Sequence, residues 1–422
     1  MNSDSSSRGP LCPLGRSPSI NSVGHRPTND VLPNHKPCKG DIRTSLISPL
    51  QGSDDFSSSE GRCPSLLIEG LHPSGLSGMK EHILNLSRDE VAERLARWGE
   101  AKFRARQVLD WIYEKRVFDF AAMSNLSASL RTRLDEAFDL RLPHIEREVG
   151  SDETRKFLFV LADGERIEAV LLAAHEGDDG AQSGRHTLCV SSQAGCAYGC
   201  GFCATGQGGW RRNLQANEIV GQVLAVEQAV RERVDNVVFM GMGEPFANYD
   251  NVMRAIGILN ALVGIGARHI TVSTCGLPPQ IRAFAEQPLQ LRLAVSLHGV
   301  NDAVRGRMMP VNKKYPVAEV LDACAYFARR KKQSLTFEYI LVAGVNDDTV
   351  QAAALAACAG RLGAKVNLIP YNAVEGLDWQ RPSEAAMREF LSVLRRGGIS
   401  ATLRREKGGD IAAACGQLRA RG

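Results

Sequence analysis

The sequence lacks three features that would narrow its class at once: a membrane-spanning run, a secretory signal and a strong excess of charge. No apolar run approaches the roughly 20 residues of a transmembrane helix, and no segment has the apolar core of a signal peptide. The 51 Lys and Arg against 47 Asp and Glu leave a net charge of only +4, which is too small to identify a partner. We therefore expect a soluble, cytoplasmic protein with no membrane partner.

The 11 cysteines among 422 residues do not have the setting of a disulfide framework. Such frameworks belong to small secreted chains, so cysteines without a secretory signal indicate a reducing compartment in which thiols serve chemistry. The length is sufficient for two domains with a sizeable core.

Residues 1–78 differ from everything after them. They are dense in Ser, Pro, Gly and Asn, and their longest apolar run is Leu66–Ile68. Because so little apolar surface is available for burial, we expect this segment to be disordered. We assign no role to the cysteines in it, Cys12, Cys38 and Cys63. The residue that follows is Met79, and translation starting there is one explanation for the segment.

The folded part is predicted to open with a helical accessory domain over residues 79–145. Ser87 and Glu90 have the spacing of a capping box, and Val91, Leu95 and Trp98 follow at helical spacing. Two further amphipathic helices are expected at 102–115 and 125–138, and a β-rich connector over 146–186 should contain strands at 156–161 and 166–172.

From residue 187 to residue 422, apolar strands alternate with amphipathic helices. The predicted strands cover 187–192, 236–241, 269–274, 292–297, 336–342, 364–369 and 401–404. The helices between them cover 217–234, 250–263, 278–285, 316–330, 347–362 and 384–396. This repeat predicts an α/β fold with a parallel sheet and helices outside it. Six clear units, short of eight, favour an open, partial (β/α)6 barrel, and a doubly wound sheet is the alternative on pattern alone.

The most informative motif is a loop of three cysteines, Cys196, Cys200 and Cys203, with the spacing C-x3-C-x2-C. A structural zinc site takes four ligands, so a zinc knuckle would need a distant fourth one. Three thiolates suit a cubane [4Fe-4S] cluster in which one iron stays open to substrate. The spacing is similar to that of radical S-adenosylmethionine (SAM) enzymes, where the open iron binds SAM and passes it an electron.

Polar residues stand at the ends of several predicted strands. They are Gly243 and Glu244 after the second strand, Ser273 in the third, Ser296, Leu297 and His298 at the fourth, and Asn372 after the sixth. The chemistry of such barrels lies at the carboxyl ends of the strands, so we expect one pocket there. Gly243 would let backbone approach a ligand, and Glu244 would offer a carboxylate to the SAM ammonium group. The Gly-Met-Gly segment lacks the third glycine of a dinucleotide fingerprint, which argues against a Rossmann fold.

These motifs occur in the order of a known family. The cysteine loop, Gly-Met-Gly-Glu-Pro, Ser-Leu-His, Asn-Leu-Ile-Pro-Tyr-Asn and the terminal Ala-Cys-Gly-Gln-Leu resemble the RlmN/Cfr family of radical SAM adenine methyltransferases over residues 80–420. The continuation of the cysteine loop through Arg212-Asn213-Leu214 is more similar to the RlmN branch. Two departures are the N-terminal extension and the Lys-Gly-Gly that precedes Asp410.

The resemblance implies a reaction that consumes two SAM molecules per turnover and uses one cluster per chain. One SAM methylates Cys415, and a radical formed from the second takes hydrogen from that methyl group, whose carbon then adds to adenine. Glu168 is implied as the proton acceptor, and Cys189 as the thiol that releases the product by forming a transient disulfide. The implied SAM contacts are Gly243, Glu244, Ser273, Ser296, Leu297, His298 and Asn372.

The implied partners are 23S rRNA, tRNA and a reductant such as flavodoxin or ferredoxin, and we expect a monomer. The helical domain and paired basic residues such as Arg211-Arg212, Arg395-Arg396 and Arg404-Arg405 would hold phosphates. Methylation at adenine C8 in the manner of Cfr, a radical SAM reaction on a substrate other than RNA, and a non-catalytic iron–sulfur protein are the alternatives. Of the remaining cysteines, Cys324 and Cys358 are expected in the core, and Cys275 near the pocket without a role.

Overall fold

The computed structural model describes residues 80–151, 153–173, 185–333, 335–404 and 411–420. The predictions for residues 1–78, including the disorder and the three cysteines, lie outside these ranges. Within them, no helix combines the length and apolar character needed to cross a membrane.

The helical module forms as the sequence predicts. It contains α1 (Arg88–Arg97), α2 (Phe103–Tyr113), α3 (Ala128–Ala137) and the short strands β1 (Glu81–His82) and β2 (Phe138–Asp139), which pair in parallel. The capping box is present: Ser87 Oγ accepts a hydrogen bond from Glu90 N at 3.3 Å, and Ser87 N donates to Glu90 Oε2 at 2.8 Å. The module is tied to α5 (Ala216–Val230) by an ion pair between the partly buried Arg116 and the buried Glu227, 2.6 Å apart.

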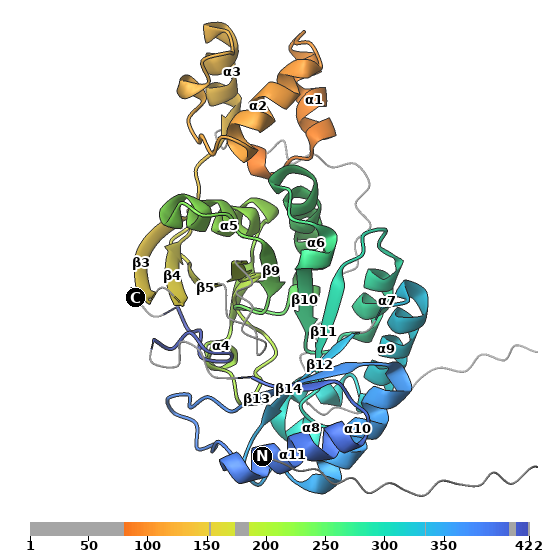
Figure 1. Ribbon diagram of the computed structural model, residues 1–422. Helices are drawn as coiled ribbons and strands as arrows, with labels where there is room; N and C mark the ends of the chain where they lie inside the picture. Colours follow the sequence, from red (N-terminus) through yellow and green to blue (C-terminus); the bar gives the residue numbers. More distant parts are fainter. Residues whose placement is uncertain (1–79, 152, 174–184, 334, 405–410, 421–422) are drawn as a thin grey trace, which may run out of the picture. The chain divides into compact units, whose positions relative to one another are not determined.

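A sheet of ten strands forms the main body (Figure 1), in the order β14-β13-β12-β11-β10-β9-β6-β5-β4-β3. The parallel strands of this sheet are β6, β9, β10, β11, β12, β13 and β14. The strands β5, β4 and β3 continue the sheet with antiparallel pairing. The strand bounds are β3 (His144–Gly150), β4 (Thr154–Val160), β5 (Arg166–Leu172), β6 (Thr187–Cys189), β9 (Asn236–Phe239), β10 (Ile270–Thr274), β11 (Arg292–Ser296), β12 (Thr336–Leu341), β13 (Lys365–Pro370) and β14 (Ala401–Leu403). Because β3 and β14 stand at its two edges, the sheet is an open barrel in the described residues, as predicted.

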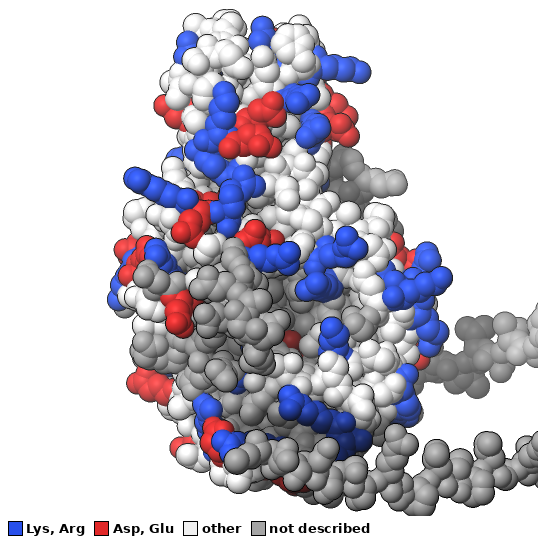
Figure 2. Space-filling model, viewed as in Figure 1, with Lys and Arg blue, Asp and Glu red and all other residues white. Residues whose placement is uncertain are grey.

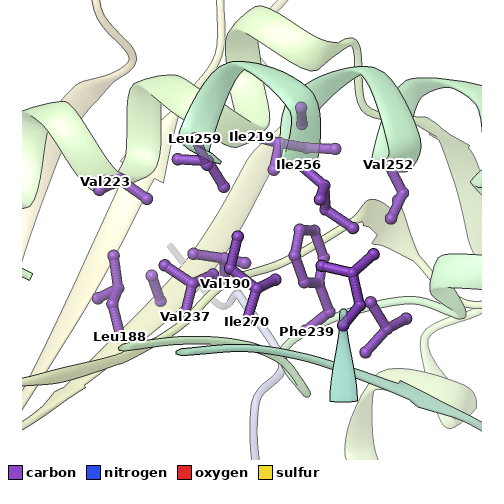
Figure 3. Packing of buried hydrophobic residues seen from close by; sticks show 14 of the residues in the cluster. Leu188, Val190, Ile219, Val223, Val237, Phe239, Val252, Ile256, Leu259 and Ile270 are labelled. Atoms are coloured by element: carbon purple, nitrogen blue, oxygen red, sulfur yellow. The ribbon is translucent and has the colours of Figure 1, made fainter. Parts of the chain in front are cut away.

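Helices cover the outer face of the sheet (Figure 1). They are α5 (Ala216–Val230), α6 (Tyr249–Ile258), α7 (Pro278–Glu286), α8 (Asp302–Met308), α9 (Val317–Lys331), α10 (Thr349–Leu362) and α11 (Glu384–Arg396). Figure 3 shows the packing that results: Leu188, Val237 and Ile270 of the strands face Val223 and Ile256 of α5 and α6. All five side chains are completely buried, so the layer is held by apolar contact.

Several elements were not predicted, and strand β3 and helix α8 illustrate the physical reasons. Strand β3 has the sequence His-Ile-Glu-Arg-Glu-Val-Gly and is mostly exposed, so it carries no apolar signal of its own and forms because β4 offers a free edge. Helix α8 has only seven residues, which is too short for a periodic pattern. The expected β-rich connector is not a separate layer, since its strands extend the barrel sheet.

Candidate active site

The three-cysteine loop lies between β7 (Gln193–Gly195) and α4 (Ala204–Gln207), and its backbone is fixed at three points. Cys196 N donates to Gly209 O at 2.8 Å, next to β8 (Trp210–Asn213), and Gly201 N donates to Met308 O of α8 at 2.8 Å. Cys203 N donates to Cys200 O at 3.1 Å, which closes the loop on itself. All three cysteines line a cavity of about 150 Å³.

The electrostatics of this cavity suit a cofactor with positive metal centres. Burial raises the pKa of the Cys196 thiol to about 12, and it raises those of Cys200 and Cys203 as well. Cys203 also raises the pKa of Cys196, and both of them raise the pKa of Cys200, since neighbouring thiolates repel. Within the described ranges no group of His, Cys, Asp and Glu could hold a metal ion. A cubane cluster is wider than one ion and needs thiols around a cavity, so the arrangement fits a cluster better than a zinc knuckle.

Most of the strand-end residues gather at the same cavity. Gly243, Glu244, Ser273, Ser296 and His298 all line it together with the cysteines. They come from β9, β10 and β11, whose carboxyl ends meet at this edge of the sheet, and this is the convergence that the strand pattern predicts.

Glu244 is buried, and its carboxylate is held by two backbone donors. Oε1 accepts from Phe246 N at 3.0 Å and Oε2 accepts from Cys275 N at 2.7 Å. Burial nevertheless raises its pKa. Gly243 has φ of +97°, and a Cβ there would stand 2.5 Å from Cβ of Gln193. Glycine is therefore required by the protein's own packing, in addition to any approach by a ligand.

His298 is a buried neutral imidazole next to the cysteine loop. Burial lowers its pKa to about 3, and Nδ1 accepts a hydrogen bond from Ile340 N at 3.0 Å. Its ring meets that of Phe202 edge to face, with centroids 4.7 Å apart. The predicted SAM contact at Leu297 would have to come from its backbone, because this side chain is fully buried in the core and does not line the cavity. Strand alternation points it away from its neighbours Ser296 and His298.

A second cavity of about 300 Å³ holds the other two predicted reactive thiols, Cys189 and Cys415. Cys203 and Cys415 line both cavities, so Cys415 stands between the cluster site and Cys189. Asn372 lines this second cavity and donates from Nδ2 to Cys415 O at 3.1 Å. Its contact with SAM stays a prediction, and in this structure its side chain holds the backbone of Cys415.

The C-terminal segment that carries Cys415, residues 411–420, is attached to several distant parts of the chain. Gly416 O accepts from Ala204 N at 2.7 Å, and Leu418 O accepts from the buried Thr205 Oγ1 at 2.6 Å. On the other side, Arg419 N donates to Glu168 Oε2 at 2.9 Å. These bonds place the sulfur of Cys415 without help from regular secondary structure.

Glu168 is buried on β5 but does not line either of these cavities. Its carboxylate forms an ion pair with Lys156 at 3.2 Å, and Lys156 Nζ also donates to Ala412 O at 3.3 Å. Glu168 and Lys156 face a separate cleft of about 440 Å³. The structure therefore brings Cys189 and Cys415 together, and leaves Glu168 on the opposite side of the C-terminal segment.

Three site residues escaped the sequence analysis. Arg404 was taken as half of a surface pair, yet it lines the second cavity, with Nη1 3.5 Å from Cys415 Sγ. Its position directly after β14, at the carboxyl end of a strand, was the feature of the sequence that could have indicated this. Glu338 lines the first cavity and was visible as a lone charge within the apolar strand β12. Arg305 on α8 is completely buried behind the cysteine loop, and no pattern in the sequence marks it.

The basic pairs are less available to RNA than the sequence suggests. Figure 2 shows Lys and Arg side chains over the helical module and the flank of the barrel, with Asp and Glu among them. Arg212 forms ion pairs with Asp163 and Glu218, and Arg396 pairs with Glu389. These arginines stabilise the fold, so the paired pattern alone overstates the phosphate-binding surface.

Comparison with known proteins agrees with this geometry. The radical SAM superfamily is matched by residues 190–357, and the N-terminal domain of ribosomal RNA large subunit methyltransferases is matched by residues 82–140. A probable dual-specificity RNA methyltransferase RlmN from Akkermansia muciniphila is 50% identical over 338 residues, 79% of this chain and 94% of that protein. The chain belongs to the RlmN family.

Other RlmN relatives and a solved structure show the same extent of similarity. A second probable RlmN, from Opitutus terrae, is 49% identical over 345 residues and is covered to 92% of its length. The crystal structure of a radical SAM methyltransferase from Sphaerobacter thermophilus, 43% identical, is matched over its whole chain and 81% of this one with a TM-score of 0.76. Family membership implies a [4Fe-4S] cluster and SAM, and the cavity ringed by cysteines fits both.

Proposed function

We propose that the protein is a SAM-dependent RNA methyltransferase that forms 2-methyladenosine in 23S rRNA and in tRNA. The observation that carries the proposal is the position of Cys415, whose side chain lies between a three-cysteine cavity and a second thiol, Cys189. The RlmN names of the relatives and the match to an rRNA methyltransferase N-terminal domain support RNA as the substrate.

The chain's own residues divide the cofactor binding between them. Cys196, Cys200 and Cys203 would hold the cluster, which supplies the electron that cleaves SAM. Glu244 would accept the ammonium group of SAM, and Ser273 and Ser296 are placed to hydrogen-bond its polar groups. The neutral His298 and the buried Phe202 keep water from this side of the cavity.

Cys415 and Cys189 would act in turn as methyl carrier and resolving thiol. In the first step the sulfur of Cys415 takes the methyl group of one SAM as that sulfonium bond breaks. In the last, Cys189 sulfur would bond to Cys415 sulfur as the bond from that sulfur to the product carbon breaks. The electron pair of the broken bond stays on the carbon, which takes up the proton given up by the Cys189 thiol, and a disulfide and a methyl group result. Arg404 places a positive charge beside Cys415, with Nη1 3.5 Å from its sulfur.

Glu168 is the proposed acceptor of the proton that leaves the adenine ring. Its carboxylate is held by Lys156 and by the backbone N–H of Arg419. The second contact comes from the C-terminal segment. When that segment moves, the carboxylate of Glu168 would become accessible to the adenine ring of the RNA. Proton removal and release of Cys415 would then be coupled.

The partners complete the proposal. We propose that the helical module contributes to RNA binding, that a flavodoxin or ferredoxin supplies electrons, and that the enzyme acts as a monomer in a reducing cytoplasm. The eight cysteines in the described ranges are all free thiols, as such a compartment requires.

Mass spectrometry of RNA nucleosides tests the reaction. The reconstituted protein, given SAM, a reductant and rRNA or tRNA, is expected to produce 2-methyladenosine, and Cys415→Ala serves as the inactive control. Mainly 8-methyladenosine would reassign the target carbon. SAM cleavage without any methylated RNA would point to a substrate other than RNA.

A further inference from the structure

Arg305 is a buried charge that forms no ion pair within the described residues. The carboxylate linked to it, that of Asp302, is exposed and reaches it only through Asn312, whose Nδ2 donates to Asp302 Oδ1 at 2.9 Å. The Arg305 side chain on α8 is completely buried. Nη1 donates to Asn312 Oδ1 at 2.9 Å and to Tyr315 O at 3.4 Å, and Nη2 donates to Cys275 O. Nε has no partner. All of these partners are neutral, and no carboxylate of the described residues forms an ion pair with Arg305.

Such an arrangement is expensive, because a buried ion loses several kcal/mol of hydration, and the exposed carboxylate of Asp302 offsets only part of that loss. The surroundings are nevertheless shaped to keep it. A Cβ at Gly276 would stand 3.1 Å from Nη2, and one at Gly299 would stand 2.6 Å from the Arg305 backbone nitrogen. An apolar side chain would fill the same space at lower cost, so the charge is expected to have a partner when the enzyme is complete.

The three-cysteine cavity is the place where that partner would lie. The carbonyl that Nη2 holds belongs to Cys275, which lines the cavity with Cys200. The helix that carries Arg305 braces the cysteine loop directly, because Met308 O accepts from Gly201 N at 2.8 Å.

The other charged groups near the cavity do not supply a positive charge there, so Arg305 is the one that would balance a negatively charged cluster. Glu244 and Glu338 line it and are anionic when ionised, and His298 is neutral. Arg404 stands at Cys415, in the second cavity. A cluster held by three thiolates carries net negative charge and gains more on reduction, so a fixed cation behind Cys200 favours the reduced form.

We propose that Arg305 is the fixed counter-charge of the three-cysteine site and raises the reduction potential of the cluster bound there. The inference rests on the cluster assignment of the proposed function, and it makes Arg305 a positioning and tuning residue. A unit charge acting over about 10 Å at a dielectric constant of about 20 changes the equilibrium constant for reduction on the order of tenfold.

The test compares Arg305→Lys, which keeps the charge, with Arg305→Gln, which keeps hydrogen bonding without charge. Arg307→Gln on the exposed side of the same helix is the matched control. Each protein is reconstituted anaerobically, its iron and sulfide are measured, and the cluster is titrated against potential by electron paramagnetic resonance without RNA. Melting temperatures of the apoproteins report folding.

The expected result is a midpoint shifted to more negative potential in Arg305→Gln, by the equivalent of about tenfold, with Arg305→Lys and Arg307→Gln unchanged. Loss of iron from Arg305→Gln alone would also support the counter-charge. An unchanged midpoint in a fully loaded Arg305→Gln would overturn it, as would equal losses in Arg305→Lys, since the charge is then not what matters. A wild-type protein that binds no cluster would instead defeat the proposed function.

Discussion

The three-cysteine loop and the C-terminal segment meet at the same cavities, but they are held in different ways. The loop places Cys196, Cys200 and Cys203 within eight consecutive residues, and one of its bonds, from Cys203 N to Cys200 O, is internal. The segment around Cys415 is held by Ala204, Thr205 and Glu168, which are distant in sequence.

This difference explains how two kinds of chemistry can share one space. A cluster needs ligands whose spacing does not change, and a short loop braced by α8 provides that. A methyl carrier has to face SAM, then the RNA base, then Cys189. A segment attached by separable hydrogen bonds can make these changes at a cost of about 1 kcal/mol for each bond released.

The largest effect is expected from the loop. Replacing Cys196, Cys200 or Cys203 by Ala should abolish binding of about four irons and four sulfides per chain, and SAM cleavage with it. Cys415→Ala is the control, because the segment supplies no cluster ligand and iron content should remain full. Stoichiometric zinc in the wild-type protein, with no iron-linked absorbance, would refute the cluster.

The segment and its partner thiol should fail at two different steps. Cys415→Ala should never acquire a methyl group and should reduce RNA methylation to background. Cys189→Ala should accumulate a covalent protein–RNA adduct, since no thiol remains to release the product. Denaturing gels with labelled RNA and mass spectrometry distinguish the two. Normal methylation by both variants would exclude the two-thiol mechanism.

The loop side should also show a dependence of stability on pH that the segment does not share. His298 stays neutral in the folded apoprotein down to about pH 3, whereas in the unfolded chain it gains a proton near pH 6.5. The free energy of unfolding should therefore fall by about 1.4 kcal/mol per pH unit from His298 alone as the pH drops from about 6.5 toward 3.

His298→Asn removes that contribution, and Asn is suited to the site because it tolerates the φ of +54° and can accept from Ile340 N. Urea unfolding of both apoproteins at a series of pH values measures the difference. Parallel curves for wild type and variant would show that His298 does not stay neutral in the fold.

A smaller change should loosen the segment while keeping all three cluster ligands, although the Thr205 hydroxyl also contacts the thiol of Cys203. Thr205→Val keeps the shape of the side chain but leaves Leu418 O without its donor, at a cost of about 1–3 kcal/mol. Iron content should stay full, single-turnover methylation should slow by roughly tenfold, and the C-terminus should become easier to cleave with protease. The exposed Thr402→Val is the control, and equal behaviour of the two would show that this bond does not seat Cys415.

The smallest effect is expected at a cysteine that belongs to neither region. Cys324 on α9 is completely buried in the core, where burial raises the pKa of its thiol to about 12. Cys324→Ala should lower stability by about 1 kcal/mol through lost packing, with iron content and methylation unchanged. Any loss of cluster in this variant would mean that iron binding also depends on residues outside the three-cysteine loop.

Much of this protein is determined by its sequence because the signals are local. The spacing of Cys196, Cys200 and Cys203, the capping box at Ser87 and the alternation of strands and helices each depend on residues close together in the chain. The convergence of Glu244, Ser273 and Ser296 also followed, because carboxyl ends of parallel strands meet at one edge.

Only the tertiary structure decided the rest, because the remaining contacts join residues far apart in the chain. Arg404 lies at Cys415 rather than on the surface, Leu297 points into the core, and Glu168 faces a different cleft from the two thiols. Arg305 is the clearest case. Its sequence neighbours describe a short solvated helix. Its burial arises because the distant Cys275 and the segment after the helix, with Asn312 and Tyr315, close around it.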